Sequence, residues 1–173
     1  MVSDERINQG RKSTTTFLIV DAQSVKNVDT AEQKGYDGGK KVSGIKRTIL
    51  VDTNGLPHAV MVTTANVTDR AAAIEAVSTN QEYLQSVEKV LADGGYTGEN
   101  FAQSINDLIQ AEVEIAKRNE LHKFAIIPKR WVVERSFAWI DKCRRLWKNC
   151  ERKLSTSLQM INLAFIRILL SRS

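Results

Sequence analysis

Residues 45–64 read IKRTILVDTNGLPHAVMVTT and contain two runs rich in β-branched side chains, at residues 45–51 and 57–64. The turn signal DTNG, at residues 52–55, lies between the two runs. An Asn-Gly pair is typical of tight β-hairpins, because both residues tolerate the positive φ that such turns require. This stretch therefore predicts two antiparallel strands joined by a hairpin.

A third strand is predicted just upstream. Residues 16–21 (TFLIVD) form a short apolar run that ends in an acid, which is typical of a buried strand with Asp21 at its C-terminal end. Residues 22–44 are rich in Lys, Gly and Asp without a sustained period and predict a loop. Residues 1–15 are expected to be a flexible segment, so the folded domain is expected to span residues 16–173.

The second half of the chain alternates strand and helix signals. Residues 88–93 (EKVLAD) repeat the pattern of an apolar run ending in an acid, Asp93, and residues 111–116 alternate at period two. Apolar spacing and capping residues predict helices at residues 69–84, 97–110, 128–148 and 155–170. A meander followed by strand–helix units predicts an α/β fold, with a mixed sheet of three antiparallel and then two parallel strands and flanking helices.

Composition narrows the class of protein. The chain has 173 residues, 42% of them hydrophobic and 26% charged, as expected for one globular domain. Its two cysteines, Cys143 and Cys150, are too few for a disulfide framework and match no zinc-ligand spacing. No apolar run reaches the roughly 20 residues that span a bilayer, and no secretory signal is recognisable. The sequence therefore predicts a protein of the reducing cytoplasm.

Charge is distributed unevenly along the chain. Residues 1–116 carry 11 basic and 16 acidic side chains, a net charge of −5, whereas residues 117–153 carry 12 basic and 4 acidic side chains, a net charge of +8. A basic segment can follow a phosphate backbone, although a solvated helix face is the ordinary explanation of such a run. Trp131, Trp139 and Trp147 are interleaved with the basic residues, which favours nucleic acid, but core packing explains them equally well.

Three carboxylates are candidates for catalysis. Asp21 and Asp93 end strands expected near the middle of the sheet, where α/β folds form their active-site crevices. Glu134 lies in the first turns of a predicted helix, and Arg130, one turn earlier on the same face, can hold this carboxylate or bind a phosphate. Converging carboxylates repel each other unless a cation joins them, and hard oxygen ligands select Mg²⁺ or Mn²⁺. Two such ions, about 4 Å apart, stabilise the phosphoryl displacement that cuts DNA.

Four stretches, in chain order, carry a resemblance to a known family: IVDAQSVKN from residue 19, GKKVSGIKRTILVDTNG from residue 39, VLADGGYTG from residue 90, and PKRWVVERSFAWIDKCRRLWKNCER from residue 128. They resemble the DDE transposases of bacterial insertion sequences, in the group named after insertion sequence five. The resemblance implies an RNase H-like fold in which Asp21, Asp93 and Glu134 form the DDE triad and bind two divalent ions. It also implies hydrolysis at the element's ends, exposing 3′ hydroxyls that attack target DNA.

The chain departs from the family at some positions. The family has a signature of Tyr, Arg, Glu and Lys around the last acid, and Arg130 and Glu134 match it. Ile127 takes the place of the Tyr, and Asp141 takes the place of the Lys, with Lys142 adjacent. Thr48 stands where relatives often have His. The roles of the family's Tyr, Lys and His are therefore not carried over to this chain.

Several residues near the acids are candidates for DNA contact. A solvated loop explains the lysines of the first hairpin as well as DNA does. Tyr96, after a Gly-Gly turn, could stack on a flipped base, although an exposed loop tyrosine is the commoner case. His58, His122 and both cysteines are expected to be structural. The DNA-binding candidates are Lys40, Lys41, Lys46, Tyr96, Lys129, Arg130, Lys142, Arg144 and Arg145.

Family members usually carry an N-terminal segment that recognises the terminal repeats, whereas only 20 residues precede Asp21. The sequence therefore predicts that this segment is absent, as in a second reading frame joined by frameshifting or in a decayed copy. A DNA-binding remnant without cleavage is thus an alternative function. A receiver-like or nucleotide-binding module is another, but no Gly-rich phosphate loop follows the first strand. The expected partners are terminal inverted repeats and target DNA, bound at the nucleoid by a homo-oligomer.

Overall fold

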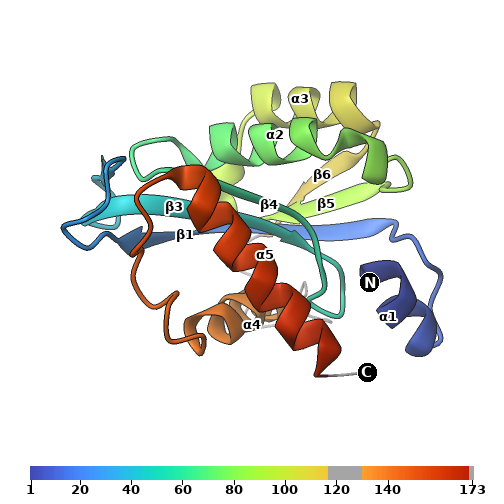
Figure 1. Ribbon diagram of the computed structural model, residues 1–173. Helices are drawn as coiled ribbons and strands as arrows, with labels where there is room; N and C mark the ends of the chain where they lie inside the picture. The colour runs from blue at the N-terminus through green and yellow to red at the C-terminus, as the bar shows by residue number, and fades with distance from the viewer. Residues whose placement is uncertain (117–129, 172–173) are drawn as a thin grey trace.

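Helices cover both faces of one mixed sheet in the computed structural model, which describes residues 1–116 and 130–171 (Figure 1). None of the helices in these ranges is long and apolar enough to cross a membrane. The elements in chain order are α1 (Val2–Asn8), β1 (Phe17–Lys26), β2 (Gly35–Asp37), β3 (Val42–Val51), β4 (Pro57–Thr64), α2 (Asp69–Thr79), η1 (Gln81–Tyr83), β5 (Lys89–Ala92), η2 (Gly94–Tyr96), α3 (Glu99–Ile109), β6 (Glu112–Ile115), α4 (Arg130–Asp141) and α5 (Leu154–Leu170).

The sheet has the strand order β2-β3-β1-β5-β6, and β4 pairs with β3 beside β2. β3 is antiparallel to β1, β2 and β4, whereas β5 is parallel to both β1 and β6. This arrangement confirms the predicted mixed sheet of three antiparallel strands followed by two parallel strands. The short strand β2 is an addition to the prediction.

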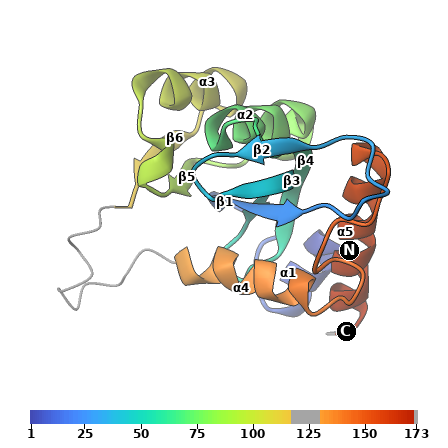
Figure 2. The same cartoon turned by 90° about the vertical axis from the view of Figure 1, so that its left-hand side faces the viewer.

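Two apolar clusters fill the space between the sheet and the helices, because successive side chains of a strand point to opposite faces. Leu18 and Val20 pack with α2 and α3, whereas Ile19 packs with α4 and α5. In the same way β5 sends Val90 toward the first pair of helices and Leu91 toward the second. Figure 2 shows α2 and α3 above the sheet and α4 below it. Each fully buried Leu, Ile or Val contributes about 1.5–3 kcal/mol to folding.

The hairpin between β3 and β4 forms at the predicted turn signal. Gly55 adopts a φ of +80°, which side-chain-bearing residues rarely adopt. The Asp52 Oδ1 atom accepts hydrogen bonds from the backbone N–H groups of Asn54 (2.8 Å) and Leu56 (3.1 Å), so the loop satisfies its own donors.

The N-terminal segment differs from the prediction of a flexible stretch. Residues 2–8 form helix α1, and the buried Arg6 side chain forms an ion pair with the buried Asp52 carboxylate. Arg6 also donates hydrogen bonds to the carbonyl oxygens of Lys12 (2.9 Å) and Thr14 (2.9 Å). A charged pair separated by 46 residues gives no signal in the local sequence, so the helix looks like a polar tail when read alone.

The predicted loop at residues 22–44 is also partly wrong. β1 continues to Lys26, β2 occupies Gly35–Asp37, and β3 begins at Val42. Gly44 pairs with both β1 and β2, and a Cβ at this position would lie 2.0 Å from the Val25 carbonyl oxygen. The strands here are rich in Gly and polar residues, so the sequence hides them, although Val25 of β1 packs into the core on the α4 side.

Helix α4 is shorter than predicted, because it ends at Asp141 rather than near residue 148. The buried residues of the helix itself are Val132, Val133, Ser136, Phe137 and Ile140, whereas Trp139 is only half-buried.

Candidate active site

The register of the sheet places Asp21 and Asp93 side by side. β1 and β5 are parallel, with Ile19 opposite Leu91, and each aspartate lies two residues beyond that pair. Because side chains alternate along a strand, both aspartates share the sheet face on which Ile19 and Leu91 pack against α4. Asp93 therefore follows the C-terminal end of β5, whereas Asp21 lies in the middle of the neighbouring strand β1, which continues to Lys26 beyond the predicted end; both acids are on the α4 side.

Local hydrogen bonds orient both carboxylates. The Asp21 Oδ1 atom accepts a hydrogen bond from the backbone N–H of Ala22 (2.8 Å). The Asp93 Oδ1 atom accepts one from the N–H of Gly95 (2.8 Å) and so caps the short helix η2. Both side chains are half-buried, so they are fixed by the backbone and still reachable from solvent.

Glu134 lies on α4, with its side chain exposed. The helix packs onto the same sheet face through Val133, Phe137 and Ile140. Within residues 1–116 and 130–171, no three His, Cys, Asp or Glu side chains gather closely enough to hold a metal ion. The register thus directs the two aspartates to the same sheet face, and Glu134 does not form a three-ligand group with them among the described residues.

Tyr96 is buried, with 1% of its surface exposed, so the prediction of a DNA-stacking side chain is wrong. The capped turn after Asp93 directs the ring into the α2/α3 cluster, where it packs against Phe101 with ring centroids 5.3 Å apart. Burial raises the pKa of Tyr96 far above its usual value, and the charges of Asp21, Asp69 and Asp93 raise it further. A neutral phenol therefore lies within electrostatic reach of both candidate aspartates.

Lys46 is also unavailable for DNA, contrary to prediction. Its side chain is 3% exposed, and its ammonium group forms an ion pair with Asp69 (2.6 Å) and donates a hydrogen bond to the Val67 carbonyl oxygen (2.5 Å). Lys40 contacts the same carboxylate (3.3 Å) and the Ala22 carbonyl oxygen (2.9 Å) but stays partly exposed, and Lys41 is exposed.

Gln23, which sequence reasoning missed, and Arg47, which it grouped with the basic residues of the first hairpin, hold the end of α4 against the sheet. Gln23 and Arg47 face each other across β1 and β3. Gln23 Nε2 donates a hydrogen bond to Asp141 Oδ2 (2.9 Å), and Arg47 Nη1 lies 3.9 Å from Asp141 Oδ1. Burial lowers the pKa of Arg47 to about 10, against the opposing effects of Asp141 and Cys150. Asp141, which replaces the family's Lys, therefore points inward to the sheet.

The middle of α4 rests on the β3–β4 hairpin. Ser136 Oγ donates a hydrogen bond to the Gly55 carbonyl oxygen (3.0 Å), and Arg135 Nη2 donates one to the Asn54 carbonyl oxygen (3.0 Å). The Arg135 guanidinium also lies over the Trp131 and Trp139 rings, 4.7 Å and 5.0 Å from their centroids. These contacts fix the rotation and position of the helix that carries Glu134.

Comparison with known proteins agrees with this geometry. The sequence model of the family described as "Transposase DDE domain" matches residues 12–169. The chain belongs to the transposase DDE domain family. A Burkholderia cepacia protein named as a transposase for insertion sequence element IS402 is 35% identical over 117 residues, which cover 64% of this chain and 55% of that protein. The chain thus spans about half the length of this curated relative.

Solved structures confirm the RNase H-like fold of this transposase domain. One is the simian T-cell lymphotropic virus intasome in complex with PP2A regulatory subunit B56 gamma (TM-score 0.59, 14% identity, covering 90% of this chain and 48% of that chain). Another is the catalytic core domain of BIV integrase (TM-score 0.52, 12% identity, covering 87% and 81%). The predicted resemblance to insertion-sequence DDE transposases is confirmed, and this family generally uses divalent metal ions.

Other predicted site residues of the transposase domain fall into two groups. Lys142, Arg144 and Arg145 are exposed just beyond α4, and Arg145 pairs with Glu151 (2.8 Å). The described residues do not include Lys129, Ile127 or His122, and the side chain of Arg130 is likewise not described. Thr48 is fully buried in β3.

His58 and the two cysteines are the remaining residues for which a structural role is expected. His58 Nε2 lies 3.5 Å from Asp52 Oδ2, at the hairpin. Cys143 and Cys150 are unpaired and half-buried.

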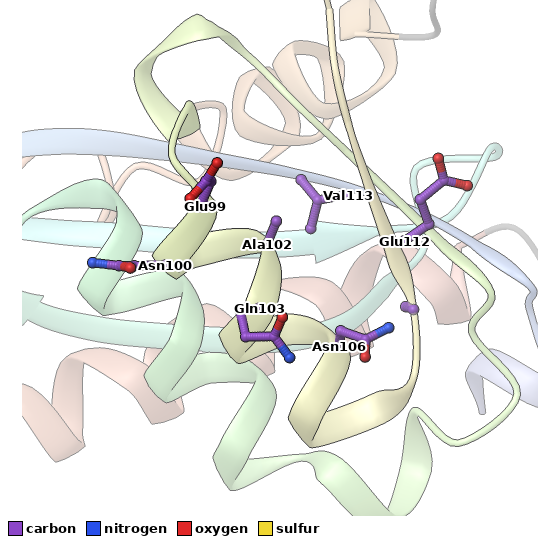
Figure 3. Close-up of a pocket in the computed structure, with 8 residues that line it drawn as sticks. Glu99, Asn100, Ala102, Gln103, Asn106, Glu112 and Val113 are labelled. Carbon is purple, nitrogen blue, oxygen red and sulfur yellow. The ribbon is translucent and has the colours of Figure 1, made fainter.

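A separate cavity of about 580 Å³ lies between α3 and β6 (Figure 3). Its lining includes Glu99, Gln103, Asn106 and Glu112, and none of the candidate catalytic residues contributes to it. Carboxylates repel phosphate groups, so this cavity is poorly suited to DNA. It is not part of the candidate active site.

Proposed function

We propose that this chain is the catalytic domain of an insertion-sequence transposase, which cleaves DNA at the element's ends and joins the ends to target DNA. Asp21, Asp93 and Glu134 would hold two divalent ions, Mg²⁺ or Mn²⁺. The observation that carries the proposal is the parallel register of β1 and β5, which directs Asp21, in the middle of β1, and Asp93, just after β5, to the sheet face covered by the helix that bears Glu134.

The donor set fits hard divalent cations. Two neighbouring carboxylates supply oxygen ligands from a rigid sheet, and their mutual repulsion favours a bound cation. When bound, the ions would stabilise the charge on the attacking and leaving oxygens of the phosphodiester. Glu134 must approach the aspartates to complete the ligand set, and its side chain is exposed on α4.

DNA is the substrate that this site would take. The exposed basic side chains at residues 142–145 adjoin the helix that carries Glu134, so they lie where a phosphate backbone could pass the acids. Asp141 does not oppose this role, because its carboxylate already contacts Gln23 and Arg47.

The first experiment is cleavage of DNA that carries the element's own ends, with Mg²⁺ or with EDTA. We expect Asp21→Asn, Asp93→Asn and Glu134→Gln each to lower the cleavage rate at least about 1,000-fold and to leave DNA binding intact. Mn²⁺ binding, followed by electron paramagnetic resonance, should weaken in both aspartate variants. Asp107→Asn and Glu75→Gln, on exposed positions of α3 and α2, serve as controls.

Two outcomes separate this proposal from its alternative. Full cleavage by any of the three acid variants would exclude the assigned triad. DNA binding without metal-dependent cleavage by the wild-type chain would favour the DNA-binding remnant. That alternative draws on the observation that no three metal-binding side chains gather within the described residues.

Assembly of more than one copy on the DNA is part of the proposal. α5 packs on the sheet through Ile161 and Phe165, but Leu163, Ile166 and Leu170 are exposed on its outer surface. Such side chains are suited to contact with a second copy. Light scattering of the chain with and without end DNA would measure the stoichiometry.

A further inference from the structure

A second cavity, of about 440 Å³, lies along the part of β1 that follows Asp21. It is lined by residues 23–26 of β1, by Val42 and Asp141, and by Trp147 and Lys148. Gln23 follows Asp21 by two residues on the same sheet face, a separation of roughly 7 Å along the strand. The cavity is therefore a neighbour of the proposed catalytic carboxylates, on the side where α4 ends.

An exposed aromatic ring and two amino groups border this cavity. Trp147 is 62% exposed, which is unusual for so large an apolar side chain. The Lys148 Nζ atom lies 4.5 Å from the centroid of the Trp147 ring, and Lys26 is exposed at the end of β1. An aromatic surface beside amino groups matches the two parts of a nucleotide, a flat base and an anionic phosphate.

The polar wall of the cavity is arranged to accept rather than to repel such a ligand. Gln23 Nε2 is used by Asp141, whereas the buried Gln23 Oε1 atom has no hydrogen-bond partner among the described residues. The negative charge of Asp141 faces the buried guanidinium of Arg47. The one carboxylate that lines the cavity therefore already faces a cation.

The segment that bears Trp147 is firmly attached to the strand end. The Asn149 N–H donates to the Lys26 carbonyl oxygen (2.9 Å), and the Val28 N–H donates to the Asn149 carbonyl oxygen (2.9 Å). The buried Asn149 side chain bonds to Asn27 Oδ1 (2.9 Å) and accepts from Ser157 Oγ (2.7 Å). A site held in this way is preorganised, so binding of a ligand would cost little conformational entropy.

We propose that this cavity binds one unpaired nucleotide of the DNA strand, next to the phosphate that is cut. The base stacks on Trp147, and the flanking phosphates contact Lys26 and Lys148. Paired bases in a duplex are already stacked on each other, so only an unpaired or extruded base can use the ring. The position of this nucleotide relative to the cut rests on the proposed function, whereas its binding does not.

Binding can be measured without cleavage, in EDTA. The probes are a hairpin DNA with a short single-stranded overhang that contains 2-aminopurine, and the same hairpin with a blunt end. We expect Trp147→Ala to weaken binding of the overhang DNA about 10-fold, to abolish the stacking-dependent quenching of 2-aminopurine, and to leave blunt-end binding within about 2-fold. Trp147→Phe should retain most of the affinity and the quenching.

Matched variants make the result specific. Trp131→Ala removes another exposed tryptophan (55% exposed), on α4, and should not change the preference for the overhang. Asp107→Asn, on an exposed position of α3, should bind as the wild type does. Because binding is measured in EDTA, loss of cleavage and loss of nucleotide binding remain distinguishable. Equal binding of the overhang DNA by Trp147→Ala and wild type would overturn the proposal, as would an equal loss for blunt and overhang DNA. If Trp147→Ala did not fold, Lys148→Gln would serve as the test, with about a 5-fold loss expected for the overhang.

Discussion

Asp21 and Asp93 are placed by backbone pairing, whereas the helix that carries Glu134 is placed by side chains. The two aspartates follow the parallel register of β1 and β5, which ladder hydrogen bonds fix. α4 depends on Ser136 and Arg135 at the hairpin and on Asp141 at β1. One half of the site is therefore insensitive to most substitutions, while the other half depends on a few contacts beneath one helix.

The prediction with the largest expected effect on this contrast compares two buried phenylalanines. Phe137 packs α4 onto the sheet, and Phe101 packs α3 onto the opposite face. Each change to alanine should lower the free energy of unfolding by about 3–5 kcal/mol, because each leaves a cavity. Only Phe137→Ala should also lower cleavage by the folded protein, at least about 10-fold, because it loosens the support of Glu134. Urea unfolding and cleavage assays at low temperature measure the two effects, and equal cleavage by both variants would contradict the contrast.

The backbone-placed half of the site could be predicted from the sequence, and much of the side-chain-placed half could not. Asp21 and Asp93 each end a short apolar run, and the Asn-Gly pair marks the hairpin, so these features are local. Arg47 and Lys46 look like surface residues within β3. Their carboxylate partners, Asp141 and Asp69, are distant in the sequence, so their burial becomes visible only once the strands and helices are assembled.

Tyr96 shows the same limit over a shorter distance. The sequence Asp-Gly-Gly-Tyr reads as an exposed turn, and nothing in it indicates on which side the tyrosine lies. The Asp93 carboxylate caps the turn through the Gly95 N–H, and this cap turns the ring toward Phe101. A tight turn changes the direction of the side chains within one residue. Whether the residue after the turn is buried can therefore be predicted only from the three-dimensional path of the chain.

A second prediction concerns Asp52, in the hairpin on which α4 rests, and the pH dependence of the stability that it provides. Burial alone would raise the pKa of Asp52, but His58 and the backbone N–H groups of Asn54 and Leu56 lower it below the usual 3.8. The Asp52 carboxylate therefore stabilises the fold at every pH above the usual pKa of 3.8. This stability is lost as the pH falls through the lower pKa of the folded state. We expect Asp52→Asn to lower the free energy of unfolding by about 3 kcal/mol at pH 7. The difference from wild type should shrink below the usual pKa of Asp52, as measured by urea unfolding from pH 7 to pH 3, and a constant difference would argue against this account.

A third prediction separates backbone strain from contact with α4. Gly55→Ala places a Cβ at a φ of +80°, 2.8 Å from Ser136 Oγ and 3.1 Å from the Trp139 ring. We expect a loss of about 2 kcal/mol in stability and a several-fold loss of cleavage, because the helix must shift. Gly10→Ala is the control, since its φ is +70° and its added Cβ meets nothing within 4 Å. This control should show the strain alone, with cleavage unchanged in the folded protein.

The smallest expected effects are those of the exposed basic residues after α4, which touch neither half of the site. Lys142→Ala and Arg144→Ala should each weaken DNA binding roughly 5-fold at moderate salt and lower the slope of log affinity against log salt by about 1, because each removes one phosphate contact. Arg145→Ala should have a smaller effect, since its guanidinium is already paired with Glu151 at 2.8 Å. Lys12→Ala, exposed in the acidic part of the chain, is the matched control. Fluorescence anisotropy over a salt series measures all four variants. An equal loss for Lys12→Ala would mean that the affinity follows net charge alone, and that the basic residues next to the catalytic helix do not form a DNA path.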